Sequence, residues 1–219
     1  MRISLVRGNS TEHLDLVPSK IIGIGVNYRA HAAEMGMTPL PEEPLMFLKP
    51  PSAMIASGEA IERPGGYARV DYEAELGVVI GQRARRVSRE RALEVVMGYC
   101  CVNDVTVRDL QKKDVQFTRA KGFDTFCPIG PRIVAGLDPS KLAIRTRVNG
   151  AIRQDSTTAD LIFDVPTLIS FCSHHMVLEP GDVISTGTPS GVGNLTPGDV
   201  VAIEIEGIGV LENRVIARP

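Results

Sequence analysis

Acidic residues occupy alternate positions in one short segment of the chain. The segment VDYEAELGV places Asp71, Glu73 and Glu75 two residues apart. Successive side chains of a β-strand point to opposite faces, so a strand here would put the three carboxylates on one face. Such a row is either a solvated sheet face or a site for a divalent cation, and oxygen ligands suit Mg²⁺, Mn²⁺ or Ca²⁺ better than Zn²⁺. The apolar run LGVVIG indicates that the strand enters the core, which favours the metal site.

A further carboxylate and a His–Glu pair could complete such a site. Asp104 follows the apolar run CCVN, where it either caps a helix or serves as a third metal ligand. His31 and Glu34 lie three residues apart in NYRAHAAEM, so their side chains would meet on a helix. A carboxylate beside an imidazole fixes its tautomer and raises its basicity, which suits a general base. A surface pair without a chemical role has the same spacing.

Two other segments contain small or basic residues suited to a ligand. Lys121 lies between aromatic residues and before the turn CPIGP, as either a solvated lysine or a cation near the site. The segment 186–193, TGTPSGVG, lacks the Walker lysine and the GxGxxG order, so it predicts no nucleotide site. Its small residues still let a carboxylate approach backbone N–H groups. His174 and His175 lack acidic or cysteine neighbours at zinc-ligand spacing, and we interpret them as structural.

Strands are expected to position most of these residues. Short runs rich in Val and Ile, bounded by Gly, Pro, Asn or Asp, predict strands that include 20–26, 76–80, 183–186 and 200–205. Periodicity and capping residues predict helices over 28–35, 88–99, 104–114 and 164–173. Because the strands do not alternate with long helices, a doubly wound parallel sheet is disfavoured and a strand-rich α+β domain is expected.

The chain is rich in glycine and proline, with 21 and 15 residues among 219. Segment 36–51 contains several of these prolines and is expected to be an ordered, irregular loop. The four cysteines show no CxxC spacing, so we expect reduced, mostly buried thiols. Adjacent Cys100 and Cys101 would point to opposite faces of a strand.

Charge and hydropathy exclude several classes of protein. A net charge of −2 gives no electrostatic footprint for nucleic acid. The longest uncharged runs, 165–178 and 183–198, are too short or too polar to span a membrane. The start MRISLVRGNS has no apolar core of a secretory signal. We therefore expect a cytoplasmic protein without nucleic-acid or membrane partners.

The order of these motifs along the chain is more specific than any one of them. From residue 20 to residue 214 the sequence resembles the fumarylacetoacetate hydrolase family, and most closely its short branch of acylpyruvate hydrolases and 2-oxo-acid decarboxylases and isomerases. The segments that carry the resemblance are NYRAHAAEMG, FLKPPSA, DYEAELGVVIG, GYCCVNDVTVRDLQ, KGFDTFCPIGP, LEPGDVISTGTPSGVG and IEGIGVLEN.

The resemblance implies roles for nine residues. The implied metal ligands are Glu73, Glu75 and Asp104, and the implied catalytic residues are His31, Glu34 and Lys121. The implied substrate-binding residues are Arg108, Gln111 and Thr188. The implied cofactor is Mg²⁺ or Mn²⁺. Asp71 matches no family ligand and is expected to be solvated or to lie behind the ligands.

The resemblance also implies a fold and a reaction. The family fold is a mixed β-sandwich roll, expected here as one catalytic domain over residues 1–219, in which 1–19 form a short N-terminal strand segment, and family members are usually homodimers. The activity implied first is metal-dependent hydrolysis of a C–C bond in acylpyruvate-type 2,4-dioxo acids through a metal-bound enolate. The alternative is decarboxylation or isomerisation of 2-oxo or 2-hydroxymuconate-type dicarboxylic acids in aromatic catabolism, oxaloacetate decarboxylation included. A third hypothesis, a binding protein that has lost activity, is disfavoured because His31, Glu34, Lys121 and the three carboxylates are present together.

Overall fold

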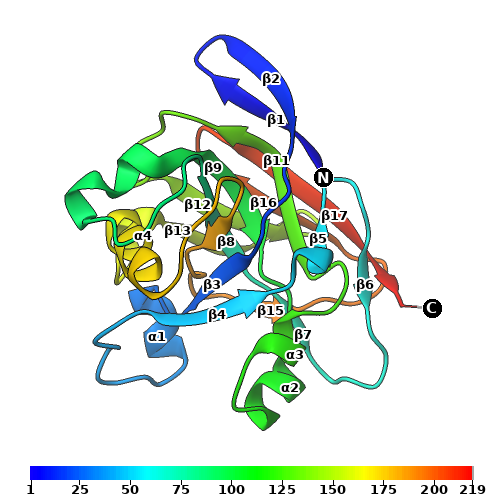
Figure 1. The fold of residues 1–219 in the computed structure, drawn as a ribbon. Helices are drawn as coiled ribbons and strands as arrows, with labels where there is room; N and C mark the ends of the chain where they lie inside the picture. Colours follow the sequence, from blue (N-terminus) through cyan, green and yellow to red (C-terminus); the bar gives the residue numbers. More distant parts are fainter. Residues whose placement is uncertain (219) are drawn as a thin grey trace.

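Three sheets make up most of the computed structural model, which describes residues 1–218 (Figure 1). The nine-stranded sheet has the order β2 (Ser10–Asp15), β1 (Arg2–Arg7), β11 (Cys127–Val134), β9 (Val96–Asn103), β8 (Ala74–Ile80), β14 (Val183–Ser185), β3 (Ile21–Gly25) and β4 (Leu45–Lys49), with β5 (Met54–Ile55) paired to β11. The five-stranded sheet has the order β13 (Ala151–Thr157), β12 (Ala143–Val148), β16 (Val200–Ile205), β17 (Gly209–Ala217) and β6 (Ile61–Arg63). The three-stranded sheet comprises β10 (Thr106–Val107), β7 (Val70–Tyr72) and β15 (Gly193–Asn194).

Helices are few and short. The α-helices are α1 (Arg29–Glu34), α2 (Arg108–Lys113), α3 (Thr118–Lys121) and α4 (Val165–His175), and the 3₁₀ turns are η1 (Pro51–Ala53), η2 (Arg89–Val95) and η3 (Thr158–Asp160). Parallel pairs such as β3–β14 and antiparallel pairs such as β8–β9 occur in one sheet. The strand-rich α+β class with mixed sheets is therefore confirmed. None of the helices within residues 1–218 is long and apolar enough to cross a membrane.

Two helix predictions are partly wrong because pairing with distant strands overrides local preference. The helix expected over 88–99 is a 3₁₀ turn that ends at Val95, and the chain then pairs with β8 as strand β9. The helix expected over 104–114 begins only at Arg108, after the short strand β10. The prediction for α4 is confirmed, and Asp164 caps the helix by accepting a hydrogen bond from the Thr167 N–H at 3.0 Å.

The prediction of an irregular loop over 36–51 is wrong for Leu45–Lys49. These residues form β4, which pairs antiparallel with β3 in the register Gly23 to Phe47. A Cβ atom at position 23 would lie 2.2 Å from Phe47 Cζ, so a glycine is required there for the ring to lie across β3. β4 is an edge strand of the nine-stranded sheet, and its last residue, Lys49, lies near the end of β9.

The nine-stranded sheet is apolar on both faces. One face packs with α4 and the five-stranded sheet through residues such as Leu76, Leu168 and Ile203. The other face carries a second cluster, to which Ile3 and Leu5 of β1 belong. Cys101 belongs to the first cluster and Cys100 to the second, as strand alternation predicts. The four cysteines are buried and free, as expected.

The buried carboxylate of Asp182 joins the starts of β3 and β14. It accepts hydrogen bonds from the backbone N–H groups of Ser19, Lys20 and Glu179, and it pairs with the Lys20 ammonium. Burial alone would raise the pKa of Asp182, but these hydrogen bonds outweigh it and hold the pKa below its usual value.

We predict that Asp182→Ala lowers the free energy of unfolding by about 3 kcal/mol, because several charge-assisted hydrogen bonds to a buried group are lost. Urea unfolding measures this. Asp155→Ala is the control: its exposed pair with Arg145 is worth about 0–1 kcal/mol. The loss of stability caused by Asp182→Ala should shrink as the pH falls below about 4, because the Asp182 carboxylate of the wild type then becomes protonated. Equal effects of the two substitutions would contradict this account.

Candidate active site

Three carboxylates converge where β8 and β9 meet. Glu75 lies in β8, Glu73 just before it, and Asp104 directly after β9. The pairing of Ala74 with Asn103 sets these residues side by side, and the Asp104 N–H donates to the Glu73 carbonyl at 2.9 Å. Each acid offers an oxygen within 4.8 Å of the others. All three are at most 4% exposed, so the solvated-face interpretation is wrong here.

The same geometry excludes the helix-cap interpretation of Asp104. The N-cap residue of α2 is Val107, and no side chain caps that helix. The Asp104 carboxylate instead faces the cluster, with its two oxygens bound by two different lysines.

Lys121 lies within this acidic cluster. Its Nζ donates to Glu73 Oε2 at 2.9 Å, to Asp104 Oδ2 at 2.6 Å and to Thr106 Oγ1 at 2.8 Å. Burial lowers the pKa of Lys121, but the charges of Asp104 and Glu73 outweigh it and raise the pKa overall. The interpretation as a solvated lysine is therefore wrong.

Lys49 is a second buried lysine, to which we assigned no role from the sequence. Its Nζ donates to Asp104 Oδ1 at 2.6 Å, and the residue is 1% exposed. The available signal was a lysine that ends the apolar run LMFLK. Lys49 and Lys121 thus hold the two oxygens of Asp104 from opposite sides of the carboxylate.

Arg108 links the acids to the next helix. Its Nη2 donates to Glu73 Oε1 at 2.5 Å, its Nε to Asp71 Oδ2 at 2.8 Å, and its Nη1 to Gln111 Oε1 at 2.7 Å. Asp71 is fully buried and also accepts from Arg69, so the solvated alternative for Asp71 is wrong. Asp71 therefore orients Arg108 and does not face the acidic cluster as a fourth carboxylate.

Glu73 and Glu75 have opposite electrostatic surroundings. Burial would raise the pKa of Glu73, but Lys121 and Arg108 outweigh it and lower the pKa to about 2. For Glu75, burial and then the charges of Asp104 and Glu73 raise the pKa to about 8. Ser185 Oγ and the Gly187 N–H donate to Glu75 Oε2 at 2.5 and 2.9 Å. Within residues 1–218, Glu75 forms no ion pair, and a cation at the cluster would supply the missing charge.

The residues present fit a divalent metal. Three buried oxygen donors within 4.8 Å of one another are the hard ligands that Mg²⁺ and Mn²⁺ prefer. Burial and the nearby charges of Asp104 and Glu73 raise the pKa of Glu75, which means that they disfavour its ionised form. A bound cation would stabilise that ionised form.

His31 and Glu34 meet on α1 as predicted. The distance from His31 Nδ1 to Glu34 Oε2 is 3.1 Å, and the Gly191 N–H donates to the same carboxylate at 3.3 Å. His31 is 5% exposed, whereas the Glu34 side chain is 42% exposed. The imidazole therefore faces the interior and its carboxylate partner lies at the rim.

A small inner cavity collects most of the predicted residues. Its volume is about 100 Å³, and its lining includes His31, Glu73, Glu75, Arg108, Gln111, Lys121 and Thr188. Glu34 lies outside it, on a larger adjoining basin of about 540 Å³. Asp104 does not line the inner cavity either, although its ligand oxygen lies within 4.8 Å of the other acids.

Gln154 fixes Thr188 at this cavity, and the sequence did not point to it. Its Nε2 donates to Thr188 Oγ1 and to the Pro189 carbonyl, both at 2.8 Å. Its Oε1 accepts from the Ala74 N–H at 3.1 Å. One buried amide therefore ties the loop of Thr188 to the strand that carries Glu75.

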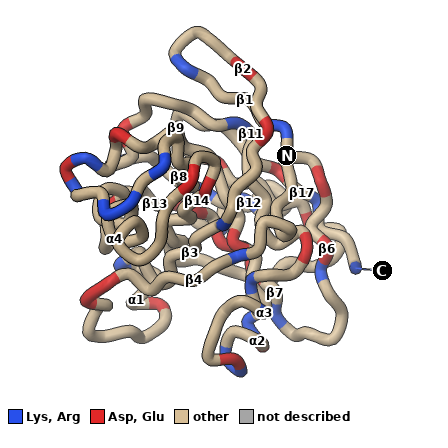
Figure 2. Tube along the Cα trace, in the orientation of Figure 1, with Lys and Arg blue, Asp and Glu red and all other residues tan. Residues whose placement is uncertain are grey.

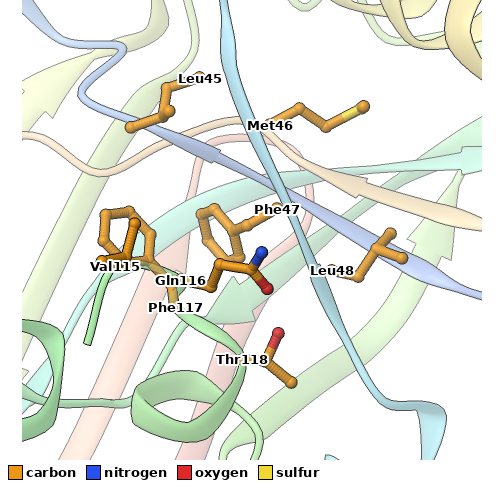
Figure 3. Close-up of a pocket in the computed structure, with 8 residues that line it drawn as sticks. All are labelled: Leu45, Met46, Phe47, Leu48, Val115, Gln116, Phe117 and Thr118. Atoms are coloured by element: carbon orange, nitrogen blue, oxygen red, sulfur yellow. The ribbon is translucent and has the colours of Figure 1, made fainter.

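A third hollow lies between β4 and the segment before α3 (Figure 3). Among the described residues, none that lines it is ionisable, so it is no candidate for the chemistry. Its Phe47 and Phe117 rings pack edge to face at 5.6 Å. Lys121 Nζ lies 4.9 Å from the centre of the Phe47 ring, so this ring also stabilises the buried ammonium.

Charged residues elsewhere are spread along the whole trace (Figure 2). Acidic and basic residues are interspersed on the same elements, as the near-zero net charge predicts. Most charged residues of the candidate site, in contrast, are buried.

Known proteins resemble the chain over nearly its whole length. An uncharacterised protein of Methanocaldococcus jannaschii is 54% identical, over 95% of this chain and 87% of its own length. The crystal structure of a 5-carboxymethyl-2-hydroxymuconate delta-isomerase from Mycobacterium smegmatis matches with a TM-score of 0.88 and 49% identity, over 93% of this chain and 81% of that one. A fumarylpyruvate hydrolase from Pseudomonas aeruginosa, solved with Mn²⁺ and pyruvate, matches with a TM-score of 0.89 and 32% identity, over 99% and 97%.

The family model of the fumarylacetoacetate hydrolase C-terminal domain matches residues 20–216. This range contains all three buried acids, the His31–Glu34 pair and Lys121. The chain belongs to the fumarylacetoacetate hydrolase family, whose members include hydrolases, isomerases and decarboxylases.

Proposed function

We propose that the chain is a divalent-metal-dependent hydrolase that cleaves a C–C bond in acylpyruvate-type 2,4-dioxo acids. The observation that carries the proposal is the buried cluster of Glu73, Glu75 and Asp104 on a cavity that His31 also lines. These acids would hold Mg²⁺ or Mn²⁺, which supplies Lewis-acid stabilisation of negative charge on a substrate oxygen. The Mn²⁺- and pyruvate-bound structure of a related fumarylpyruvate hydrolase supports the choice.

The side chains of this cavity can perform the remaining steps. His31, oriented by Glu34, takes a proton from water, and that water attacks the distal acyl carbonyl. The bond between the acyl carbon and the pyruvate CH₂ breaks, and the proton held by His31 returns to the pyruvate carbon. Gln111 offers N–H donors at the cavity for developing negative charge, and Lys121, whose three N–H bonds already go to Glu73, Asp104 and Thr106, contributes its positive charge. Thr188 offers a hydroxyl to the substrate carboxylate.

Isomerisation or decarboxylation of 2-oxo or 2-hydroxymuconate-type dicarboxylic acids is the second candidate. The 49% identity to a muconate delta-isomerase favours it. These reactions need the same acids and charge stabilisation but no attacking water. Decarboxylation therefore depends less on a general base at His31, whereas isomerisation still needs a base to move a proton.

We further propose a cytoplasmic homodimer with a single catalytic domain over residues 1–219.

Direct assays separate these candidates. With Mn²⁺ or Mg²⁺ we expect the protein to release pyruvate from acetylpyruvate, measured by a coupled lactate dehydrogenase assay. Carbon dioxide release from oxaloacetate and isomerisation of a 2-hydroxymuconate-type acid are measured in parallel. Faster turnover in either parallel assay would replace hydrolysis with the second candidate, and no turnover of any substrate would favour a protein that has lost activity.

We predict that His31→Ala lowers kcat for acetylpyruvate by about 10²–10⁴-fold, the usual contribution of a positioned general base. Mn²⁺ affinity should change little, because His31 is not among the clustered acids. The matched control is His174→Ala, since His174 is exposed and its ring forms a hydrogen bond with the Ser170 carbonyl of its own helix. A loss of only a few-fold in His31→Ala would exclude the base role.

We predict that Mn²⁺ affinity rises with pH up to about 8 and then levels off, because the metal must displace the proton that the raised pKa keeps on Glu75. Without metal, Glu75 holds a proton between about pH 4.5 and 8 in the folded state but not in the unfolded state. Its contribution to the free energy of unfolding therefore falls as the pH rises through this range. Calorimetric titrations at pH 6, 7 and 8 measure the trend. Glu75→Gln should weaken Mn²⁺ binding and remove the pH slope; an unchanged slope in that variant would contradict the assignment.

A further inference from the structure

The larger outer basin opens directly onto the inner cavity. Both are lined by His31, Met35, Arg108, Gln111 and Phe117. The basin is about 540 Å³, against about 100 Å³ for the inner cavity. A substrate whose 2-oxo acid head occupies the inner cavity would therefore extend its other end into the basin.

Arg108 is not available to bind that other end. Its three guanidinium nitrogens donate to Asp71, Glu73 and Gln111, at 2.8, 2.5 and 2.7 Å. Its side chain is 11% exposed. Moving the Arg108 guanidinium toward the far end of the basin would break this buried hydrogen-bond network.

Arg69, in contrast, presents free donors to the basin. Its backbone is fixed on both sides, since its N–H donates to Asp109 Oδ2 at 3.1 Å and its carbonyl accepts from the Arg108 N–H at 2.9 Å. Its Nε donates to Asp71 Oδ1 at 2.8 Å, and its side chain is 51% exposed. Within residues 1–218 its two terminal nitrogens have no hydrogen-bond partner. A guanidinium held by one nitrogen and open at the other two can bind a carboxylate.

The rest of the basin adds positive charge. Lys112 of α2 also lines it, and within the described chain this lysine forms no ion pair. The basin's carboxylate, Glu34, accepts hydrogen bonds from His31 and the Gly191 N–H and does not pair with Arg69 within 4.0 Å. The basin can therefore hold an anion.

We propose that Arg69, assisted by Lys112, binds the distal carboxylate of a dicarboxylic 2-oxo acid in this basin. The proposal rests on the proposed function, because it places the 2-oxo acid head in the inner cavity. Asp71 then has two roles: one carboxylate oxygen orients Arg108 toward Glu73, and the other orients Arg69 toward the basin. The enzyme would prefer dicarboxylic substrates over monocarboxylic ones of equal chain length.

The test compares two non-reacting acids of equal length, 2-oxoadipate and 2-oxohexanoate, by calorimetry with the Mn²⁺-loaded protein. We expect the wild type to bind 2-oxoadipate about tenfold more tightly, as suits a charge-assisted contact that is half exposed. Arg69→Met should reduce that preference to less than about twofold, and Lys112→Met should reduce it partly. The preference should also fall as salt is raised.

The matched control is Arg85→Met, which removes an exposed arginine outside the basin and should keep the wild-type preference. No preference in the wild type, or an undiminished one in Arg69→Met, would overturn the proposal while leaving the proposed function intact. Equal weakening of both acids in Arg69→Met would also overturn it, because Arg69 would then act only through Asp71 and Arg108. Failure of the wild type to bind either acid would overturn the proposed function as well.

Discussion

Three carboxylates buried within 4.8 Å of one another are the constraint on which this structure depends. Burying a charge is costly unless it is paired, and like charges at this distance repel. Lys121, Lys49 and Arg108 offset two of the acids, Glu73 and Asp104. Within residues 1–218, the hydrogen-bond partners of the Glu75 carboxylate are a hydroxyl and an N–H. Burial and then the charges of Asp104 and Glu73 raise its pKa. The protein therefore keeps one buried carboxylate whose charge calls for a cation from outside the chain.

Sheet topology gathers this network from segments that are distant in the sequence. The β8–β9 register sets Glu73 beside Asp104, and β14 brings Ser185 and Gly187 to Glu75. The edge strand β4 carries Lys49 to the opposite oxygen of Asp104. Figure 1 shows α1 and the α2–α3 pair at the same end of the molecule, and these short helices carry His31, Arg108 and Lys121 of the candidate site.

Local spacing identified the acids of one strand and the His–Glu pair as candidates, whereas the choice of Glu73, Glu75 and Asp104 as ligands came from the resemblance to the family. Alternation indicated Glu73 and Glu75, and helical spacing indicated the contact of His31 with Glu34. Lys49 could not be found in this way, since nothing near it marks a partner 55 residues away. The split role of Asp71 and the strand that replaces the end of the 88–99 helix likewise depend on distant pairing. Local pattern thus found candidate residues, but it left their roles open and did not show which distant residues compensate their charge.

Anomalous diffraction from a crystal soaked in Mn²⁺ is the most direct test of the central claim. The account predicts one strong peak about 2 Å from oxygens of Glu73, Glu75 and Asp104. It also predicts that the Lys121 ammonium moves away from the position it shares with Glu73 and Asp104, while Lys49 keeps its contact with Asp104. No peak at these three carboxylates, or a peak coordinated by other residues, would contradict the account.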